Sequence, residues 1–542
     1  MKKITYILAL SINFLLACNN KMDVDYIVIN ANVYTVDSSF NKAESFAVKD
    51  GKFVAVGNNL EVLKNYKSDS IINLEGRNVY PGFIDAHCHF YGYGLSLQKA
   101  NLTGTKSYNK VIEIVKNHDQ KYNHEWILGR GWDQNDWINQ EFPDNKVLNE
   151  LFPEKLVVLT RIDGHAAIAN AEALKRAGID INTKINGGKI IIKEGKLTGV
   201  LIDNAVDLVY NVIPKTSEKD NIDAFKYAQN DCFAVGLTTV SDAGLDKNIV
   251  LLIDSLQKSK QLKMRIYAML SPTDENVEYF IKKGIYKTDK LSVRAIKLYS
   301  DGALGSRGAK LKKSYTDDEN NSGILLSELA FLEKFCKLAY DNDYQVATHA
   351  IGDSANCLML NIYAKYLKEK NDKRWRIEHA QVVDSVDFQM FAQYSIIPSV
   401  QPTHATSDMY WAEKRLGNER IKNAYAYKKL LNQNGWLPAG TDFPIESINP
   451  LLTFYAAVAR KDVNNYPDEG FQIENALSRE EALRAITIWA AKSNFEENEK
   501  GSIEAGKFAD FVVTQDDIMK IDLIEITKVK VLETYIGGEK VF

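Results

Sequence analysis

The sequence predicts an α/β fold: a (β/α)₈, TIM-like barrel with a small β-sandwich formed from both termini and an insertion after the first barrel strand. The middle of the chain alternates short apolar runs with helical stretches, which is typical of a parallel sheet. Both ends consist instead of short β-branched or aromatic runs separated by turn residues. A long stretch over about 95–225 breaks the alternation and predicts the insertion.

The two ends of the chain have the same sequence pattern. Runs such as Tyr26-Ile-Val-Ile are separated by turn-forming residues such as Lys49-Asp50-Gly51, and the C-terminal end repeats the pattern with Phe511-Val-Val. We therefore expect residues 22–80 and 500–542 to form one composite β-sandwich.

Between these ends, the apolar runs number eight, as a (β/α)₈ barrel requires. The candidate strands cover residues 79–84, 236–240, 264–268, 293–299, 344–348, 375–378, 396–400 and 437–440. Helical stretches such as 328–341 and 479–492 lie between or after them. We assign residues 81–499 to the barrel. The stretch over 95–225 is too long for one crossover connection, and we expect it to cover the barrel mouth.

Composition limits the class of protein. Apolar residues make up 45% and charged residues 25% of the 542 residues, which is the balance of a soluble globular protein. The 67 Lys and Arg residues against 71 Asp and Glu residues give a formal net charge of −4. A chain this close to neutral has no bulk electrostatic attraction to nucleic acid, so we expect no such partner.

Residues 1–18, MKKITYILALSINFLLAC, have the pattern of a targeting segment. Lys2 and Lys3 precede a mostly apolar run that is too short to span a bilayer comfortably. The ending Leu15-Leu-Ala-Cys18 resembles the lipobox of bacterial lipoproteins, in which the Cys is lipidated and becomes the mature N-terminus. We therefore expect an extracytoplasmic lipoprotein that is anchored to a membrane through Cys18. An ordinary cleaved signal peptide or a frayed helix is the alternative.

Four other cysteines remain: Cys88, Cys232, Cys336 and Cys357. They are widely scattered within apolar segments, which is poor spacing for a disulfide framework. We expect them to be buried thiols.

The strongest chemical signal is a pair of histidines, His87 and His89, among only eight in the chain. The pair ends the apolar run Pro81-Gly-Phe-Ile. Alternate residues of a strand point to one face, so both imidazoles would face inward at the C-terminal end of a barrel strand. Two neutral imidazoles on one face make half a site for a divalent metal. The alternative is two polar residues that cap a strand end.

Four further polar residues lie in or end later candidate strands. Lys297 lies within Ala-Ile-Lys-Leu-Tyr, where burying a bare ammonium would be costly. His349, His379 and Asp442 each end a candidate strand. Singly, each has a structural explanation: a snorkelling lysine, a satisfied core histidine or a helix N-cap aspartate. Together with the first pair they place N and O donors on the first, fourth, fifth, sixth and eighth strands, which core packing alone does not explain.

These motifs resemble the amidohydrolase superfamily and, within it, the branch that contains N-substituted formamide deformylases, amidohydrolase family 3. The matching segments are 81–89, 296–307, 349–353, 377–381, 440–444 and 501–510, with 129–133 and 161–165 in the insertion. The resemblance covers nearly all of the chain after residue 18. Cys88 departs from the pattern, because relatives usually carry an apolar or small residue there.

The resemblance implies one or two divalent ions. His87 and His89 would bind the more buried ion, while His349 and His379 would bind the second. Lys297 would be carboxylated by CO₂ and bridge the two ions. Donors of this type favour zinc, with manganese or iron as alternatives.

The resemblance also implies that Asp442 contacts the first ion and acts as the general base, moving a proton from water to the leaving nitrogen. Substrate contacts are expected from a second set of residues, which comprises His165, Trp132, Asp133, Arg307 and His404. His118 and His124, in a charged helical stretch, are expected to face solvent.

These expectations predict a metal-dependent amidohydrolase that cleaves a non-peptide C–N bond, of amide, N-acyl or N-formyl type, in a small-molecule substrate. Hydrolysis of a cyclic amide or an ester on the same site is one alternative. A non-catalytic, lipid-anchored binding protein is another, and the complete donor set argues against it.

Overall fold

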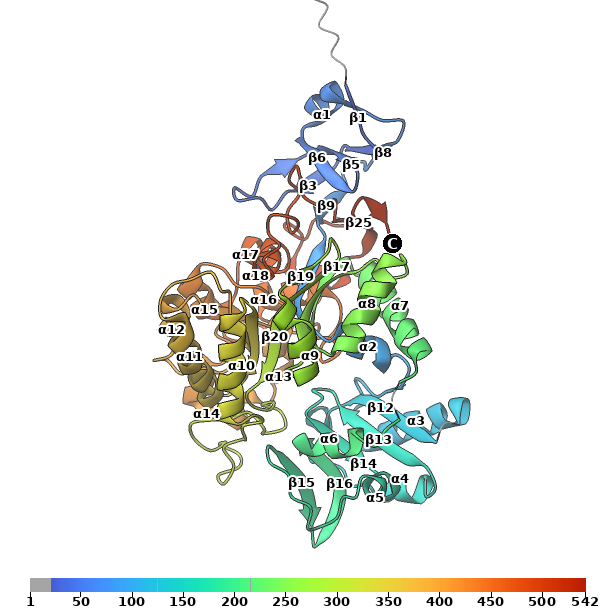
Figure 1. Ribbon diagram of the computed structural model, residues 1–542, viewed down its shortest axis with the longest axis vertical. Helices are drawn as coiled ribbons and strands as arrows, with labels where there is room; N and C mark the ends of the chain where they lie inside the picture. The colour runs from blue at the N-terminus through green and yellow to red at the C-terminus, as the bar shows by residue number, and fades with distance from the viewer. Residues whose placement is uncertain (1–20, 124, 215) are drawn as a thin grey trace, which may run out of the picture.

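The computed structural model describes residues 21–123, 125–214 and 216–542. The predicted signal peptide, Cys18 and His124 therefore lie outside the described residues. Three parts follow one another along the long axis, with the β-sandwich at one end, the barrel in the middle and the inserted module at the other end (Figure 1). Within the described part of the chain, no helix is both long and apolar enough to cross a membrane.

The barrel sheet confirms the predicted fold class. Seven strands form a continuous series of parallel neighbours, in the order β10 (Phe83–Cys88), β17 (Leu237–Leu245), β18 (Arg265–Leu270), β20 (Leu291–Tyr299), β21 (Gln345–Ala350), β22 (Arg376–His379) and β23 (Ile397–Ser399). A two-residue strand, β19 (Tyr286–Lys287), pairs antiparallel with β20.

The eighth predicted strand, residues 437–440, is reduced to a short closing segment. Ala439 pairs in parallel with Val400 on one side, and its carbonyl accepts a hydrogen bond from Ala86 N at 3.3 Å on the other. Pro438 has no N–H to donate, so a longer ladder cannot form there. The segment nevertheless closes the barrel between β23 and β10.

The first predicted strand, residues 79–84, is divided in two. β9 (Asn78–Pro81) belongs to the sandwich, and β10 begins at Phe83. Gly82 lies between them and donates its N–H to Asp510 O at 2.9 Å. A Cβ at Gly82 would come within 2.3 Å of Thr238 Oγ1, so the change of sheet depends on a residue without a side chain.

Helices cover the outside of the barrel. They include α7 (Glu218–Ala234), α8 (Lys247–Lys258), α9 (Asp274–Tyr279), α10 (Leu329–Asp341), α11 (Asp353–Leu367), α12 (Phe388–Gln393), α15 (Tyr427–Asn434), α17 (Arg479–Ala485) and α18 (Ile488–Ser493). The helical stretch predicted over 328–341 matches α10. The one predicted over 479–492 is interrupted at Thr487, whose Oγ1 donates to Leu483 O, so it becomes α17 and α18.

The β-sandwich joins both ends of the chain, as predicted. One sheet has the order β6 (Lys52–Gly57), β5 (Ser45–Lys49), β2 (Tyr26–Ile29) and β8 (Ile71–Asn73). The other has the order β26 (Glu539–Lys540), β25 (Val531–Ile536), β24 (Phe511–Thr514), β9, β3 (Asn32–Tyr34) and β4 (Lys42–Ala43). The aromatic rings of Phe46, Phe53 and Phe511 pack together in the core between the sheets.

The inserted module has its own six-stranded sheet. The strand order is β11 (Ala100–Asn101), β12 (Trp126–Trp132), β13 (Leu156–Arg161), β14 (Ala166–Ala169), β16 (Lys196–Asp203) and β15 (Gly188–Lys193). Its helices are α3 (Tyr108–Tyr122), α4 (Lys146–Leu151), α5 (Ala171–Arg176) and α6 (Asn204–Tyr210).

The C-terminal boundary predicted for the insertion, about residue 225, lies too far along the chain. α7 begins at Glu218 and packs against β17, and its Phe225 and Cys232 belong to the barrel core. The amphipathic pattern of α7 is thus explained by the barrel wall, and the module ends near Tyr210.

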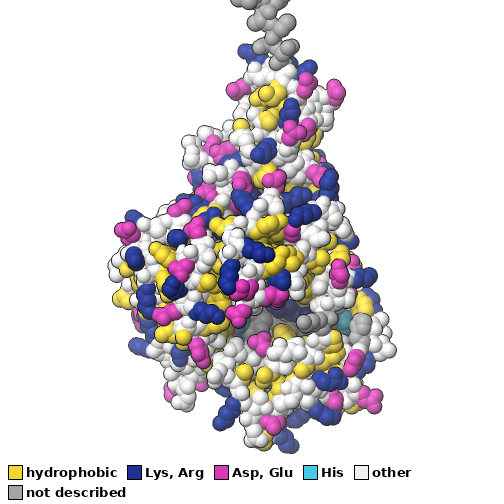
Figure 2. Space-filling view, in the orientation of Figure 1, with side chains coloured by type: hydrophobic (Ala, Val, Ile, Leu, Met, Phe, Trp, Pro, Cys, Tyr) yellow, Lys and Arg dark blue, Asp and Glu magenta, His cyan; other side chains and the backbone are white. Residues whose placement is uncertain are grey.

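Three of the four remaining cysteines are buried free thiols, as expected. Cys357 is only partly buried, because it lies on α11 beside the inward-pointing Asn356 and so turns toward the surface. On the face shown in Figure 2, basic and acidic side chains are interspersed.

Candidate metal centre and its cavity

The six predicted donor residues meet at one rim of the barrel. His87 lies on β10 and His89 immediately follows it. Lys297 lies on β20, His349 on β21 and His379 at the end of β22. Asp442 follows the closing segment. Parallel strands bring their C-terminal ends to one face of a barrel, which is why residues up to 355 positions apart converge here.

Two groups of donor atoms share Asp442. His87 Nε2 and His89 Nε2 lie 3.4 and 3.3 Å from Asp442 Oδ1. His404 Nε2, on α13 (Pro402–Asp408), lies 3.6 Å from Asp442 Oδ2, and its ring stacks against that of His379. Within each group, His87–His89–Asp442 and His379–His404–Asp442, the candidate ligand atoms all lie within 4.8 Å of one another.

His404 lines the cavity, as expected. It was expected there as a substrate contact, and the structure adds that its ring nitrogen belongs to the second donor group. His349 lies next to this group, with its ring centroid 4.6 Å from that of His379. The sequence signal for His404 was weak, because it lies on a helix after a strand, with no partner at strand spacing.

Four buried atoms at the centre have no well-aligned hydrogen-bond partner among the described residues. They are His349 Nε2, His379 Nδ1, His404 Nε2 and Asp442 Oδ1. Leaving a buried polar atom unpaired costs about 1–3 kcal/mol, so four at one place call for a common partner. Imidazole nitrogens and a carboxylate oxygen fit a divalent metal ion.

The ionisation of these groups suits metal binding. Burial lowers the pKa of His349 and His379 well below the ordinary value, which keeps both rings neutral. Burial raises the pKa of Asp442, but the neighbouring rings of His87 and His89 more than offset this, so its pKa is well below the usual range and it is ionised. Ligands of a metal must be deprotonated, and these shifts favour that state in His349, His379 and Asp442. The pKa of His87 is shifted the other way, because the effects of burial and of Lys297 are outweighed by the carboxylates of Glu378 and Asp442.

Lys297 is fully buried at the centre. Its Nζ lies 3.1 Å from His87 Nε2, and burial lowers its pKa to about 8. A lowered pKa leaves a larger fraction of neutral amine, the form that reacts with CO₂. The position and the ionisation of Lys297 are thus compatible with a carbamate.

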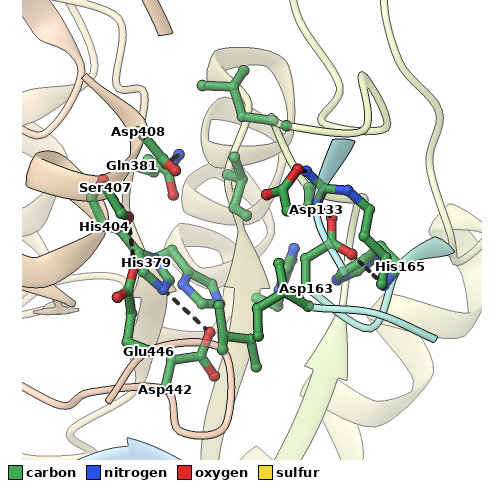
Figure 3. Close-up of a pocket in the computed structure, with 18 of the residues that line it drawn as sticks. Asp133, Asp163, His165, His379, Gln381, His404, Ser407, Asp408, Asp442 and Glu446 are labelled. Atoms are coloured by element: carbon green, nitrogen blue, oxygen red, sulfur yellow. Dashed lines mark hydrogen bonds and ion pairs between the residues drawn. The ribbon is translucent and has the colours of Figure 1, made fainter. Parts of the chain in front are cut away.

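The donor groups line a cavity of about 280 Å³ between the barrel and the inserted module. Figure 3 shows its two walls, with His379, His404, Asp442 and Glu446 on the barrel side and Asp133, Asp163 and His165 on the module side. Arg161 joins the module residues by donating hydrogen bonds to both Asp133 and Asp163. His165 and Asp133 therefore lie where the sequence placed them, at the barrel mouth.

Two expected substrate contacts lie elsewhere. Trp132 is buried in the core of the module, where its Nε1 donates to Leu159 O at 2.8 Å and its ring packs against Trp137. An irregularity in strand pairing between Arg130 and Trp132 turns this side chain inward, and Gly131 lines the cavity instead.

Arg307 also lies away from the cavity. Its guanidinium donates two hydrogen bonds to Asp317, at 3.2 and 3.0 Å, and is not part of the cavity wall. The loop that follows β20 turns this side chain away from the barrel mouth, with Arg307 itself at a φ of 60°.

The comparisons with known proteins agree with this geometry. A family model described as "Amidohydrolase family" matches residues 70–542. The chain belongs to the amidohydrolase family. Protein LONG AFTER FAR-RED 3 from Arabidopsis thaliana is 33% identical over 538 residues, which cover 96% of this chain and 91% of the relative. N-substituted formamide deformylase from Arthrobacter pascens is 25% identical over 540 residues, which cover 95% of this chain and 97% of the relative.

A solved structure supports the same assignment. The crystal structure of an uncharacterized metal-dependent hydrolase from Pyrococcus horikoshii is similar with a TM-score of 0.75 and 27% identity, covering 92% of this chain and 99% of that one. The family and this likeness support a hydrolase with a metal-dependent site.

Supporting residues of this amidohydrolase were missed in the sequence. Glu378 links two neighbours, with Oε1 3.0 Å from Arg376 Nε and Oε2 2.9 Å from His87 Nδ1. Although burial raises the pKa of Glu378, Arg376 and His87 lower it to about 2, so it is ionised. An acidic partner on the far nitrogen fixes the ring so that Nε2 faces the cavity. The i, i+2 spacing of Arg376 and Glu378, directly before His379, was the available signal.

Asp85 is another missed residue. It accepts hydrogen bonds from Thr441 Oγ1 at 2.7 Å and from His87 N at 3.1 Å. It thereby ties the strand that carries His87 to the segment that carries Asp442, whose own N–H donates to His87 O at 2.8 Å. Its position two residues before His87 was the only local hint.

Proposed function

We propose that this amidohydrolase cleaves a non-peptide C–N bond, of amide, N-acyl or N-formyl type, in a small molecule. The observation that carries the proposal is the convergence of two donor groups on the ionised Asp442 at the floor of a small cavity. The name of the similar protein from Arthrobacter pascens, N-substituted formamide deformylase, supports the substrate class.

We assign His87, His89 and Asp442 to one divalent ion, and His379 and His404, with His349 beside them, to a second. Lys297, as a carbamate, would bridge the two. The preponderance of imidazole nitrogens favours zinc. When bound, such an ion lowers the pKa of a water molecule to about 7 and polarises a carbonyl group.

The residues of the chain supply the remaining steps. Asp442 accepts a proton from the attacking water and gives it to the leaving nitrogen, because one of its oxygens faces each donor group. Glu378 holds the ring of His87 in position. The inserted module covers the cavity and limits access of bulk water, which strengthens every electrostatic interaction within it.

A substrate screen tests the proposal. Metal-loaded protein, purified without chelator, is given a panel of N-formyl and N-acyl amines together with cyclic amides and esters of similar size. Release of an amine from N-formyl or N-acyl compounds is the expected result. Turnover of esters or cyclic amides alone would contradict the substrate class while leaving a hydrolase in place. Stoichiometric binding without turnover of any compound would favour a binding protein.

We also propose that the protein is an extracytoplasmic lipoprotein. The basic Lys2-Lys3, the short apolar run and the Leu15-Leu-Ala-Cys18 ending support this location. Cys18→Ala is expected to abolish labelling with a fatty-acid analogue and to shift the protein out of the membrane fraction. Unchanged fractionation with membranes would contradict the lipid anchor.

A further inference from the structure

We propose that His165 of the inserted module accepts a hydrogen bond from the N–H of the scissile amide through Nε2, and that Asp203 is the positioning residue that makes this possible. The inference rests on the proposed function and deepens it, because it assigns the site to amides that carry an N–H. His165 lies between two cavities.

A second cavity, of about 510 Å³, adjoins the metal centre. The residues that line both cavities are His89, Asp163, His165, Tyr299 and Ile445. The ring centroid of His165 lies 5.2 Å from that of His349, beside the donor groups. A substrate with one part in each cavity would therefore have its reacting bond next to His165.

Asp203 fixes the orientation of this ring. Its Oδ1 lies 2.8 Å from His165 Nδ1, and its backbone N–H donates to His165 O at 2.7 Å. On the other side, His165 N donates to Asp163 Oδ1 at 3.0 Å. Asp203 thus engages Nδ1 of the imidazole, backbone hydrogen bonds on both sides hold the residue that carries it, and the side chain lines both cavities.

The backbone of Asp203 is strained, and its carboxylate fits only because of two glycines. Its φ of 51° and ψ of −129° are unfavourable for a residue with a Cβ. A Cβ at Gly302 would lie 2.7 Å from Asp203 Oδ1, and one at Gly308 would lie 2.6 Å from Oδ2. Oδ2 is also buried without a hydrogen-bond partner among the described residues. Strain and an unpaired oxygen at one residue point to a role other than stability.

The pair determines which kind of hydrogen bond Nε2 can make. A carboxylate facing Nδ1 accepts a hydrogen bond from it, so the neutral imidazole carries its proton on Nδ1 and presents a lone pair at Nε2. Although burial opposes the change, Asp203 also raises the pKa of His165, so this neutral form, and the contact with it, is favoured by higher pH. A lone pair at this place accepts from an N–H. A secondary amide has one, whereas a tertiary amide and an ester have none.

Matched compounds and variants test this contact. The compounds are N-butylformamide, N-butyl-N-methylformamide and butyl formate. His165→Asn removes Nε2 but keeps an N–H near the position of Nδ1, so Asp203 retains a partner. Asp203→Asn keeps the shape and tolerates a positive φ. His118→Asn, on α3 of the same module, is the matched control.

We expect His165→Asn to lower kcat/KM for N-butylformamide by about 10-fold, which corresponds to the loss of one hydrogen bond in a buried site. The values of kcat/KM for the other two compounds should change by less than about twofold. Asp203→Asn should produce the same selective loss, and the double variant should lose no more than His165→Asn alone. His118→Asn should behave as the wild type, and all variants should bind as much metal.

Equal losses on all three compounds, or no loss on N-butylformamide, would overturn the inference and leave the proposed function intact. A wild type that hydrolyses butyl formate but neither amide would overturn the proposed function. In that case the dissociation constants of the two amides, measured by calorimetry, give the same comparison without turnover. If His165→Asn weakened the binding of both amides equally, or of neither, the proposed contact would be contradicted. If His165→Asn fails to fold, Asp203→Asn provides the comparison.

Discussion

The barrel rim and the inserted module face each other across one cavity, but they hold their polar side chains differently. On the rim, support comes from neighbouring strands, since Glu378 on β22 holds His87 on β10 and Asp85 on β10 holds Thr441. In the module, the pairs are internal, as with His165 and Asp203. The rim donors are therefore supported by other barrel residues, and His165 by a residue of its own module. We therefore propose that the rim carries the chemistry and that the module contributes to selectivity.

Lys297→Ala should have the largest effect on the rim. The carbamate proposed at Lys297 could not be replaced by a methyl group, so metal and activity are expected to fall together to background. Elemental analysis and kcat, measured on the same sample, check this. Small carboxylic acids should restore part of both by filling the vacated space. A variant that keeps its metal and its activity would show that Lys297 is only a packing residue.

Asp442→Asn should separate binding from chemistry. The substitution is nearly isosteric, so much of the metal should remain, while loss of the proton acceptor lowers kcat by about 10²–10⁴-fold. The comparison is made at equal metal occupancy. Full activity in a metal-loaded variant would mean that another group is the base.

The sequence predicted the rim better than the module for a physical reason. His87 and His89 follow the period of two of a strand, and strand ends meet at one edge, so local pattern determines where those side chains lie. Pro438 was a visible reason to doubt a full eighth strand. These features need only a few consecutive residues.

The rest depends on contacts that no local pattern encodes. His404 reaches the donors from a helix, and the pairing of His165 with Asp203 joins residues 38 positions apart. Trp132 was expected to contact substrate, but one irregularity in strand pairing turns its side chain into the core of the module. Such outcomes are decided by tertiary packing.

Glu378→Gln should weaken the rim by a smaller amount. The glutamine keeps the size but removes the charge that faces Arg376 and His87 Nδ1. Losing an outer partner of a metal ligand typically lowers metal affinity or activity by about 10–100-fold. Metal titration checks this, with the exposed Glu369→Gln as control. Identical affinity in both variants would contradict the orienting role of Glu378.

Arg307→Gln should have the smallest effect, because its side chain pairs with Asp317 away from the cavity. Partly exposed ion pairs contribute about 0–1 kcal/mol, so the free energy of unfolding should change by no more than this. We expect KM to stay within about twofold, as measured by initial rates. A large rise in KM with intact metal content would indicate that Arg307 does contact the substrate.

Metal dependence of hydrolysis tests the central claim most directly. Protein purified without chelator is analysed for metal, stripped, and reloaded with zinc in steps while hydrolysis of an N-formyl amine is followed. We expect up to two ions per chain and activity that rises and falls with occupancy. Full activity in the stripped protein would contradict it.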